Sequence, residues 1–408
     1  ELDFQNTLIN NKVMKTDTQV ITAKVQIFPN KQQVIELKQM FELYSLACNW
    51  LSKKVFQNKI LNQVKLHHLV YDQMRSELGT KAQFTQSVIK TVVARYKSLK
   101  SNGHDWSLVK FSGNDYDLVW NRDYSLVGNQ FSVGVSSGRI KVNFAKKPLS
   151  KFQIAKVKFG SAKMVNKFGK WFLHIPLSKE VPALTIDEVS NVVGVDLGIN
   201  HLATTYDSKG KTDFYRGGTV KHKRGVFKAI RKSLQEKQTS SARHRLKQIG
   251  NRENRYMTDV NHQITKALTQ KHPKGTVFVL EDLTGVRQAT EKVRLKNRYV
   301  SVSWAFYQFK QLLCYKAKEN GQSVILIDPK YTSQTCPKCG HREKANRDKK
   351  KHHFHCKRCH YQSNDDRIGA MNIHRKGIEF VSQSDPSMVI EQASIAKVEV
   401  NQPDMPTA

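Results

Sequence analysis

Four cysteines in two close pairs constrain the C-terminal third of this sequence more than any other feature. Cys336 and Cys339 form one C-x-x-C pair, Cys356 and Cys359 form a second, and sixteen residues separate the pairs. This spacing predicts a tetrahedral zinc site, because each pair folds into a tight knuckle and two knuckles close on one ion. A redox C-x-x-C or two disulfides are disfavoured, since the motif is doubled and no export signal is seen. A closed four-cysteine site leaves no open position, so the zinc is expected to be structural.

The N-terminal half of the sequence changes from strand to helix and back to strand. Residues 18–28 alternate apolar and polar side chains, the period of a half-buried strand, and Pro29 follows. Asn30 with Gln33 three residues later is typical of a capping box, so a helix is expected to begin there, and helical pattern continues to about residue 100. Short apolar runs separated by turns then predict a small antiparallel β-barrel or sheet over about 105–185.

The C-terminal half has a different order of elements. Strand pattern at 191–197 is followed by two more strands and then by a long helical region from about 220 to 270. Buried strands are predicted at 276–283 and 323–329, with a helix around 300–320 between them, and a short apolar helix follows the cysteines. Three strands, a helix, a strand, a helix, a strand and a closing helix are the order of an RNase H-like nuclease core.

Three acidic residues stand where such a core brings its elements together. Asp196 ends the strand at 191–197, Glu281 ends a buried strand, and Asp366 opens the last helix. Each alone has an ordinary explanation as a turn, strand-end or helix-capping residue. Together they are the hard oxygen ligands that two Mg²⁺ ions need for phosphodiester hydrolysis, where one ion activates water and the other stabilises the leaving oxygen. The sequence therefore predicts these three residues as catalytic, magnesium-binding carboxylates.

Neighbouring acids leave two of these assignments open. Asp282 would point to the opposite face of the strand from Glu281, so only one of the two faces the site. Asp365 competes in the same way with Asp366, and spacing alone does not choose between them. Asp328 precedes Pro329 and is interpreted as a turn acid.

The charge of the chain predicts a polyanionic partner. Lys and Arg number 68 against 34 Asp and Glu, a formal net charge of +34. No apolar run approaches the roughly 20 residues of a membrane span, so no membrane partner is expected. Residues 221–255 hold twelve Lys plus Arg and two acids, and we interpret them as a surface that follows a nucleic-acid backbone rather than as an ordinary solvated face. Together with the basic loop between the cysteine pairs, they give the candidate nucleic-acid contacts Lys221, Lys223, Arg224, Arg231, Arg243, Arg245, Lys349, Lys350 and Lys351.

Four motifs in a fixed order resemble the TnpB proteins of insertion sequences and the compact type V CRISPR effectors related to them: GVDLGINHLATT, VLEDLTG, YTSQTCPKCG and DDRIGAMNI. The match is close over roughly 190–375, and in the N-terminal half only the layout agrees. The resemblance implies a RuvC-like nuclease with one site formed by Asp196, Glu281 and Asp366. It also implies a guide RNA that pairs with one strand of a double-stranded DNA target, next to a short motif that the protein reads.

The resemblance also implies a domain layout. The expected fold class is multidomain α/β plus β-barrel, with a RuvC-like, RNase H-like nuclease core, an inserted zinc module, a wedge-like β-barrel and a helical recognition insert. The predicted parts are an N-terminal extension (1–16), a wedge-like β-barrel (17–30 and 103–188), a helical recognition domain (31–102), a nuclease domain (189–335 and 361–375), a zinc-binding module (336–360) and a flexible C-terminal tail (376–408).

The third motif departs from many relatives, which read Asp-x-Asn-Ala-Ala-x-Asn-Ile. Ile368 and Gly369 stand where those relatives have Asn and Ala, while the acid at Asp366 and the later Ala, Asn and Ile match. A glycine inside a helix costs roughly 1 kcal/mol against alanine. We expect it to be tolerated where another backbone packs close to it.

The predicted function is an RNA-guided, Mg²⁺-dependent DNA endonuclease, a hydrolase, encoded by an insertion element. It is expected to act as a monomer in the bacterial cytoplasm, at the nucleoid. Three alternatives remain: a small type V CRISPR effector, a guide-dependent DNA-binding repressor without cleavage, and a transposase that transfers DNA strands. The intact acids disfavour the repressor, and the order of the motifs disfavours the transposase.

Overall fold

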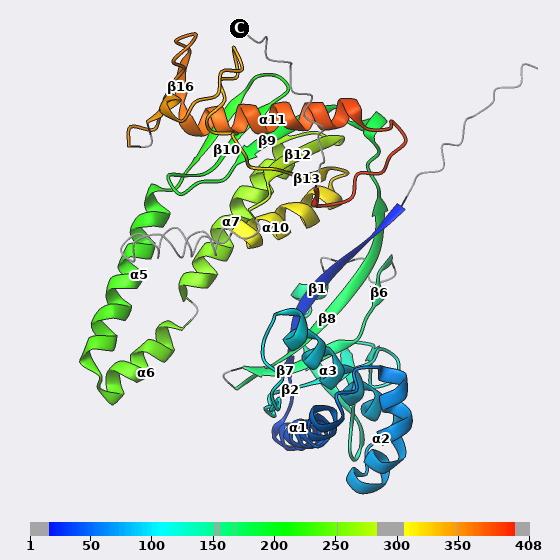
Figure 1. The fold of residues 1–408 in the computed structure, drawn as a ribbon. Coiled ribbons are helices and arrows are strands. Elements are labelled where there is room, and N and C mark those ends of the chain that lie inside the picture. The colour runs from blue at the N-terminus through cyan, green and yellow to red at the C-terminus, as the bar shows by residue number, and fades with distance from the viewer. Residues whose placement is uncertain are drawn as a thin grey trace, which may run out of the picture. The chain divides into compact units, whose positions relative to one another are not determined.

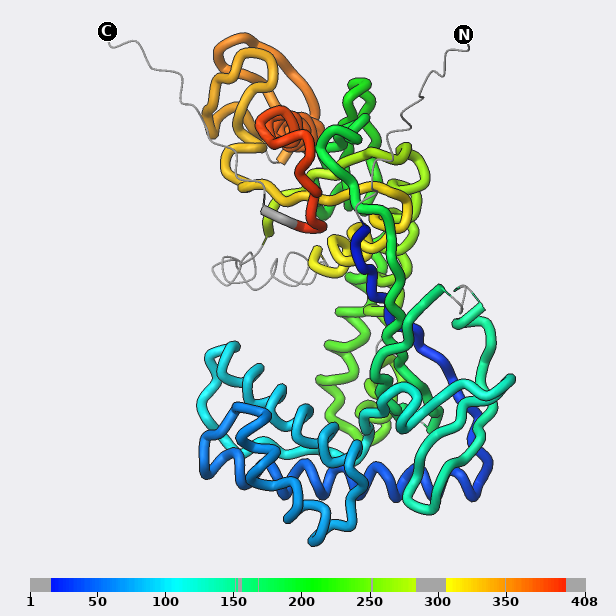
Figure 2. The backbone as a smooth tube through the Cα atoms, turned by 90° about the vertical axis from the view of Figure 1, so that its right-hand side faces the viewer, coloured from blue at the N-terminus to red at the C-terminus, as the bar shows by residue number. Residues whose placement is uncertain are grey.

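A computed structural model describes residues 16–150, 152, 156–167, 169–250, 252–283, 306–348 and 350–395, and the predictions for residues 1–15 and 396–408 lie outside this part of the chain (Figures 1 and 2). The chain divides into two compact units. One comprises Thr18–Glu180, and the other comprises Glu1–Asp17 with Val181–Ala408. Each is described by itself.

The unit Thr18–Glu180 combines a curved sheet with a group of helices. Its helices are α1 (Lys31–Asn58), α2 (Gln63–Leu78), α3 (Ala82–Ser101) and α4 (Lys147–Ser150). Its strands are β1 (Thr16–Phe28), β2 (Asp115–Leu118), β3 (Tyr124–Val127), β4 (Gln130–Val135), β5 (Gly138–Phe144), β6 (Lys158–Phe159), β7 (Ala162–Lys167) and β8 (Lys170–Pro182). They form one nearly closed sheet in the order β2-β7-β8-β1-β5-β4-β3, with β6 paired to β8.

Local sequence signals account for the beginning of α1. Asn30 accepts a hydrogen bond from the backbone N–H of Gln33 at 2.9 Å, and the Gln33 side chain accepts one from the backbone N–H of Asn30 at 3.0 Å. The predicted capping box is therefore confirmed. Apolar side chains of the helices and the sheet share one core, in which Phe41 of α1 stacks on Trp171 of β8 with ring centroids 5.1 Å apart.

The unit that contains Val181–Ala408 is built on a six-stranded sheet in the order β11-β10-β9-β12-β13-β17. The strands are β9 (Asn191–Asp196), β10 (His201–Asp207), β11 (Thr212–Arg216), β12 (Thr276–Glu281), β13 (Ser323–Ile327) and β17 (Ser394–Ile395). The first three are antiparallel to one another, whereas β9, β12, β13 and β17 run parallel. The helices are α5 (Gly218–Lys237), α6 (Ser240–Ile249), α7 (Arg252–Lys271), α10 (Phe306–Glu319) and α11 (Asp365–Gln383), with 3₁₀ turns η2 (Ile186–Glu188) and η3 (Lys344–Asn346).

Helices cover both faces of this sheet. Figure 1 shows α11 across one face and α7 and α10 on the other. Side chains alternate accordingly: Phe278 and Leu280 of β12 pack into the core with α7 and α10, while Val277 and Val279 pack into the core under α11. Because successive residues of a strand point to opposite faces, this alternation fixes which residues at the strand ends share a face.

Between β13 and α11 the chain forms a small module around the paired cysteines. Its three-stranded antiparallel sheet consists of β14 (Arg347–Asp348), β15 (His353–His355) and β16 (Gln362–Asn364). Phe354 and Ile368 pack with the cysteines in one small core, which joins the module to α11. In Figure 2, where α11 is seen along its axis, the orange chain of the module lies beside it.

The prediction of a flexible tail from residue 376 is wrong for residues 376–395. α11 continues to Gln383, and β17 adds a parallel strand to the edge of β13. Phe380 and Ile390 are buried against the sheet. The polar composition of this segment did not predict its helix and strand, because a few apolar residues are enough to cover the sheet edge.

Candidate active site and metal centres

The strand order brings Asp196 and Glu281 together. β9 and β12 pair in parallel with Val195 opposite Leu280, so the two acids are the next residues at the carboxyl ends of adjacent strands. Adjacent strands lie about 4.8 Å apart. Two acids that are 85 residues apart in the sequence are therefore neighbours in the fold.

The alternation of side chains places Glu281, and not Asp282, beside Asp196. Odd-numbered positions of β12 face α11, and even-numbered positions of β9 do so too. Asp282 continues the backbone ladder, since its N–H donates to the carbonyl oxygen of Ile327 at 2.8 Å. Its side chain therefore falls on the opposite face, and the choice that spacing left open follows from the sheet.

The head of α11 supplies two further acids, which face different partners. Asn364 caps the helix by accepting from the backbone N–H of Asp366 at 3.0 Å. Oδ2 of Asp366 lies 2.7 Å from Nδ1 of His201, at the start of β10. Asp365 turns to the cysteine module, where Nε of Arg347 donates to its Oδ2 at 2.8 Å. Asp366 is thus the acid on the strand side, and the fully buried Asp365 is held by an arginine.

Close packing of α11 on β9 depends on two glycines. A Cβ at Gly194 would collide with the α11 backbone at Ala370 and His374. A Cβ at Gly369 would lie 2.7 Å from Oδ2 of Asp196. The glycine that distinguishes the third motif therefore leaves space for the first acid. The close approach at Gly369 is made by the Asp196 side chain and not, as expected, by another backbone.

The electrostatics of the cluster favour a bound cation. Burial, then the Glu281 carboxylate, then the Asp366 carboxylate raise the pKa of Asp196 well above its ordinary value. Burial also raises the pKa of Glu281, although the Thr332 hydroxyl, which donates to Oε1 at 2.5 Å, opposes the shift. Acids that disfavour one another's ionisation become fully ionised when a cation joins them. Clustered carboxylate oxygens are also the donor set that Mg²⁺ prefers.

The four predicted cysteines converge. The Sγ atoms of Cys336 and Cys359 are 3.6 Å apart, and those of Cys339 and Cys356 are 3.5 Å apart. All four lie within 4.8 Å of one another. Four sulfurs at about 2.3 Å from one tetrahedral ion would be about 3.8 Å apart, so the cluster fits a structural zinc site.

Hydrogen bonds join the cysteine module to the head of α11. The carbonyl oxygen of His352 accepts from the backbone N–H of Asp365 and from Nδ2 of Asn364, both at 3.3 Å. Nε2 of His352 also lies 2.7 Å from Nδ2 of Asn200, in the turn after β9. With the Arg347–Asp365 ion pair, these contacts hold the module against the turn that follows Asp196 and against the helix that begins with Asp365 and Asp366.

Sequence reasoning missed the contacts that four residues make with the acids: His201, Thr332, Arg347 and His352. Two of them lie inside quoted motifs, His201 in GVDLGINHLATT and Thr332 in YTSQTCPKCG. Their roles were not visible, because His201 contacts an acid 165 residues away and Thr332 one 51 residues away.

Most of the predicted nucleic-acid contacts that the structure describes are exposed, and Arg224 is buried. Lys221, Lys223, Arg243 and Arg245 are exposed on α5 and α6, as are Lys350 and Lys351 in the module, while Lys349 lies outside the described residues. Arg224, in contrast, is buried, and its Nε donates to Glu253 at 3.1 Å; Arg231 pairs with the same carboxylate. Arg224 is therefore removed from the predicted contacts, because its charge is used inside the helical group. Among the described helices, none is both long and apolar enough to cross a membrane.

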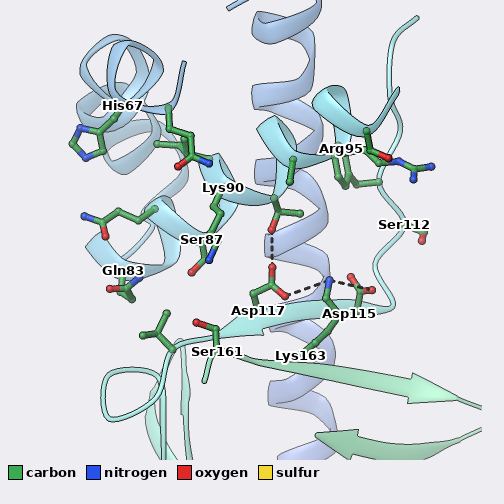
Figure 3. A pocket seen from close by; sticks show the side chains of 18 of the residues that line it. His67, Gln83, Ser87, Lys90, Arg95, Ser112, Asp115, Asp117, Ser161 and Lys163 are labelled. Atoms are coloured by element: carbon green, nitrogen blue, oxygen red, sulfur yellow. Dashed lines mark hydrogen bonds and ion pairs between the residues drawn. The ribbon is translucent and has the colours of Figure 1, made fainter. Parts of the chain in front are cut away.

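A second candidate site is a groove of about 1020 Å³ within the unit Thr18–Glu180 (Figure 3). Lys163 of β7 lies 3.3 Å from Oδ1 of Asp117 and 3.7 Å from Oδ2 of Asp115, both on β2. The Thr91 hydroxyl of α3 donates to Oδ2 of Asp117 at 2.6 Å. The polar and basic residues around this core are His67, Gln83, Gln86, Lys90, Arg95 and Lys110.

Comparison with known proteins places these sites in context. A family model described as Cas12f1-like, TNB domain, matches residues 306–373, and one described as a probable transposase (OrfB_IS605) matches residues 174–285. A CRISPR-associated endodeoxyribonuclease Cas12f1 of Syntrophomonas palmitatica is 31% identical over 51% of this chain and 43% of its own. A putative RNA-guided DNA endonuclease InsQ of Escherichia coli is 29% identical over 51% of this chain and 54% of its own. The chain thus spans about half the length of the curated relatives it matches.

The fold has a solved counterpart as well. A cryo-EM structure of a Cas12f1–sgRNA–target DNA complex aligns over 88% of this chain and 99% of its own, with a TM-score of 0.60 and 15% identity. The shared fold covers most of the chain, whereas the two relatives named above match about half of it. Together these matches confirm the predicted relationship to the TnpB proteins and the compact type V effectors.

Proposed function

We propose that this chain, a relative of the TnpB proteins and of Cas12f1, is an RNA-guided DNA endonuclease of an insertion element. The observation that carries the proposal is that the carboxylates of Glu281 on β12 and Asp366 on α11 lie near enough to Asp196 on β9 to raise its pKa. A six-stranded sheet whose parallel strands end at two acids, with a third acid on the closing helix, is the arrangement expected of a RuvC-like site.

The three carboxylates are proposed to hold two Mg²⁺ ions. Bound there, the metal would supply an activated water and stabilise the charge that develops on the leaving oxygen. The chain's own groups fix the carboxylates: His201 orients Asp366, Thr332 orients Glu281, and Gly369 leaves room for Asp196. In the same proposal, zinc braces the cysteine module and takes no part in cleavage.

The nucleic acids are proposed to lie on the basic surfaces. The exposed lysines and arginines of α5 and α6 would follow a phosphate backbone, and the Lys350–Lys351 loop would guide a strand. The wedge and recognition roles are assigned to Thr18–Glu180, whose groove offers amide and basic side chains that suit contacts with bases and phosphates. The partners are a guide RNA and a double-stranded DNA target next to a short motif, and the protein is proposed to act as a monomer in the cytoplasm.

The decisive experiment is to purify the protein from its native locus and sequence the RNA that accompanies it. We expect one abundant transcript whose end matches a DNA target, and Mg²⁺-dependent cutting of a plasmid that carries this target. A complex that binds the plasmid without cutting would favour the guide-dependent repressor. Joined DNA strands among the products would favour a transposase, and a protein free of RNA would contradict the proposal.

Replacing His201 tests how the third acid is held. An ionised carboxylate only accepts, so Nδ1 of His201 donates to Asp366. His201→Leu removes this donor, and such changes beside metal ligands typically cost about 10- to 100-fold in metal affinity or activity. His201→Asn keeps an N–H near the same place and should retain most of the affinity. Calorimetric binding of Mn²⁺ and the Mg²⁺ dependence of cleavage measure both. Equal metal affinity in His201→Leu and wild type would exclude the role, and exposed His222 provides a control position.

Replacing Gly369 with alanine separates helix stability from site geometry. Alanine favours the helix by roughly 1 kcal/mol, but its Cβ would displace the Asp196 carboxylate. Since small misplacements of catalytic groups cost up to about 100-fold, we expect a strong loss of cleavage with little change in melting temperature. Gly225→Ala in α5, where a Cβ would meet nothing within 4 Å, should leave cleavage unchanged. Full activity of Gly369→Ala would show that the close approach is unimportant.

A further inference from the structure

We infer that Tyr331 and Arg342 form a stacking site for one unpaired nucleobase of the substrate DNA, beside the acidic cluster. The inference rests on the proposed function and adds to it the position of the strand that is cut. Four observations carry it: the exposure of the Tyr331 ring, its backbone conformation, its cationic partner and its connection to Glu281.

Tyr331 is held with its ring toward solvent at a cost in backbone energy. The side chain is 48% exposed, and φ is +64°. A bulky residue in this left-handed region is uncommon and is often found at functional positions. The turn is fixed by its neighbours, because the Tyr331 carbonyl oxygen accepts from the N–H groups of Gln334 at 3.0 Å and Thr335 at 3.1 Å. Core packing does not explain a rigid, strained turn that exposes an aromatic ring.

Arg342 covers the ring of Tyr331. Its guanidinium carbon lies 3.9 Å from the ring centroid, well within the range of a cation–π contact. A backbone bridge between Thr335 and Arg342 holds the two residues together. Within the described part of the chain no acid forms an ion pair with Arg342, so this positive charge remains available beside the ring.

The turn that carries Tyr331 is connected to the acidic cluster through its neighbouring residues. The next residue, Thr332, donates its hydroxyl to Oε1 of Glu281 at 2.5 Å. Nδ2 of Asn372 in α11 donates to the carbonyl oxygens of Thr332 at 2.7 Å and Thr335 at 2.8 Å. The turn that carries Tyr331 is therefore tied to the strand of the second acid and to the helix of the third.

The chemistry of the pair selects a nucleobase. Every base has an aromatic face that stacks on tyrosine or on an arginine plane, and the guanidinium also attracts the phosphates on either side. Bases inside a duplex are stacked on one another, so the ligand is an unpaired base of a separated strand. A base held here would set which phosphate of that strand reaches the acids.

The test uses the protein loaded with its guide RNA, with Ca²⁺ in place of Mg²⁺ so that DNA binds uncut. Each strand of the target carries 2-aminopurine at one position at a time, since its fluorescence falls when it stacks. We expect one position that is quenched in wild type and in Tyr331→Phe and that recovers in Tyr331→Asn, a variant that suits the left-handed turn but lacks the ring. Tyr307→Ala, which removes a 71% exposed ring on α10, should change nothing at that position.

Cleavage gives a second readout. With Mg²⁺ and subsaturating DNA, Tyr331→Asn should cut about tenfold more slowly, the effect of one lost base stack, and an abasic nucleotide at the quenched position should abolish the difference. If the complex binds DNA but no position shows 2-aminopurine quenching that depends on Tyr331, this inference is overturned and the proposed function is not. A chain that binds neither guide nor DNA overturns the proposed function with it. A lower zinc content or melting temperature in Tyr331→Asn would assign the ring to the fold instead.

Discussion

Replacement of Asp196 by alanine is expected to lower the rate of target cleavage by about 1,000-fold while guide RNA and DNA still bind. A metal site contributes several kcal/mol to catalysis, and each 1.36 kcal/mol of barrier corresponds to about tenfold in rate. The carboxylates of both other acids, Glu281 and Asp366, raise the pKa of Asp196, so Asp196 interacts with each of them. Its loss should therefore disrupt the binding of metal rather than merely weaken one ligand. Plasmid cleavage and filter binding with the same preparation measure the two properties separately.

The same variant should be more stable than wild type when no metal is present. A carboxyl whose pKa is raised by folding destabilises the fold. The penalty is full above the raised pKa, diminishes as the pH falls from that value toward the ordinary pKa, and is absent below the ordinary pKa. Alanine removes the penalty, so the metal-free melting temperature should rise, and the increase that Mg²⁺ gives to wild type should disappear. Asp282→Ala is the matched control, because this acid lies on the opposite face of the sheet and should leave cleavage within a factor of about two. Equal loss in both variants would contradict the assigned face.

Loss of zinc is expected to have the second largest effect. Structural zinc contributes about 10–16 kcal/mol of binding energy in isolated zinc-finger peptides, which is comparable to the stability of a whole domain. Cys336→Ser removes one of four converging ligands, so the module should release its metal and unfold locally. The contacts from Arg347 and His352 to the head of α11 would then be lost. Because these contacts position Asp366, cleavage should fall at least about 100-fold.

Elemental analysis and hydrogen exchange distinguish this outcome from general unfolding. We expect one zinc per chain in wild type, none in Cys336→Ser, and faster exchange confined to the module and the first turn of α11. Cys314→Ser, at a cysteine of α10 that lies outside the cluster, should retain both zinc and activity. A zinc-free protein that cuts at the normal rate would show that the cysteine module does not position Asp366.

Periodic signals predicted the elements well because they are local. The capping box at Asn30, the strand that ends at Asp196 and the buried strand that ends at Glu281 depend on residues within one turn or one strand. The paired cysteines were also readable, since knuckle geometry follows from spacing. Each of these predictions rests on interactions between residues that are close in the chain.

The assignments that failed or stayed open depend on distant partners. Asp365 and Asp366 are distinguished by their closest partners, Arg347 at 2.8 Å and His201 at 2.7 Å, which belong to separate elements. Arg224 looked like part of a basic surface until Glu253, on another helix, was found beside it. The helix extension past residue 375 and the last strand of the sheet were hidden for the same reason, because the surface they cover belongs to β12 and β13.

The order in which the acids occur along the chain has a consequence for synthesis. The third acid follows the cysteine module, and the last described strand of the sheet comes later still. A ribosome that has made only the first 330 residues has therefore produced two carboxylates, no zinc knuckle and no closing helix. Such a nascent chain lacks the third acid of the proposed catalytic centre. Under the proposed function, the cell's own DNA would therefore meet a complete nuclease site only after translation has passed residue 366.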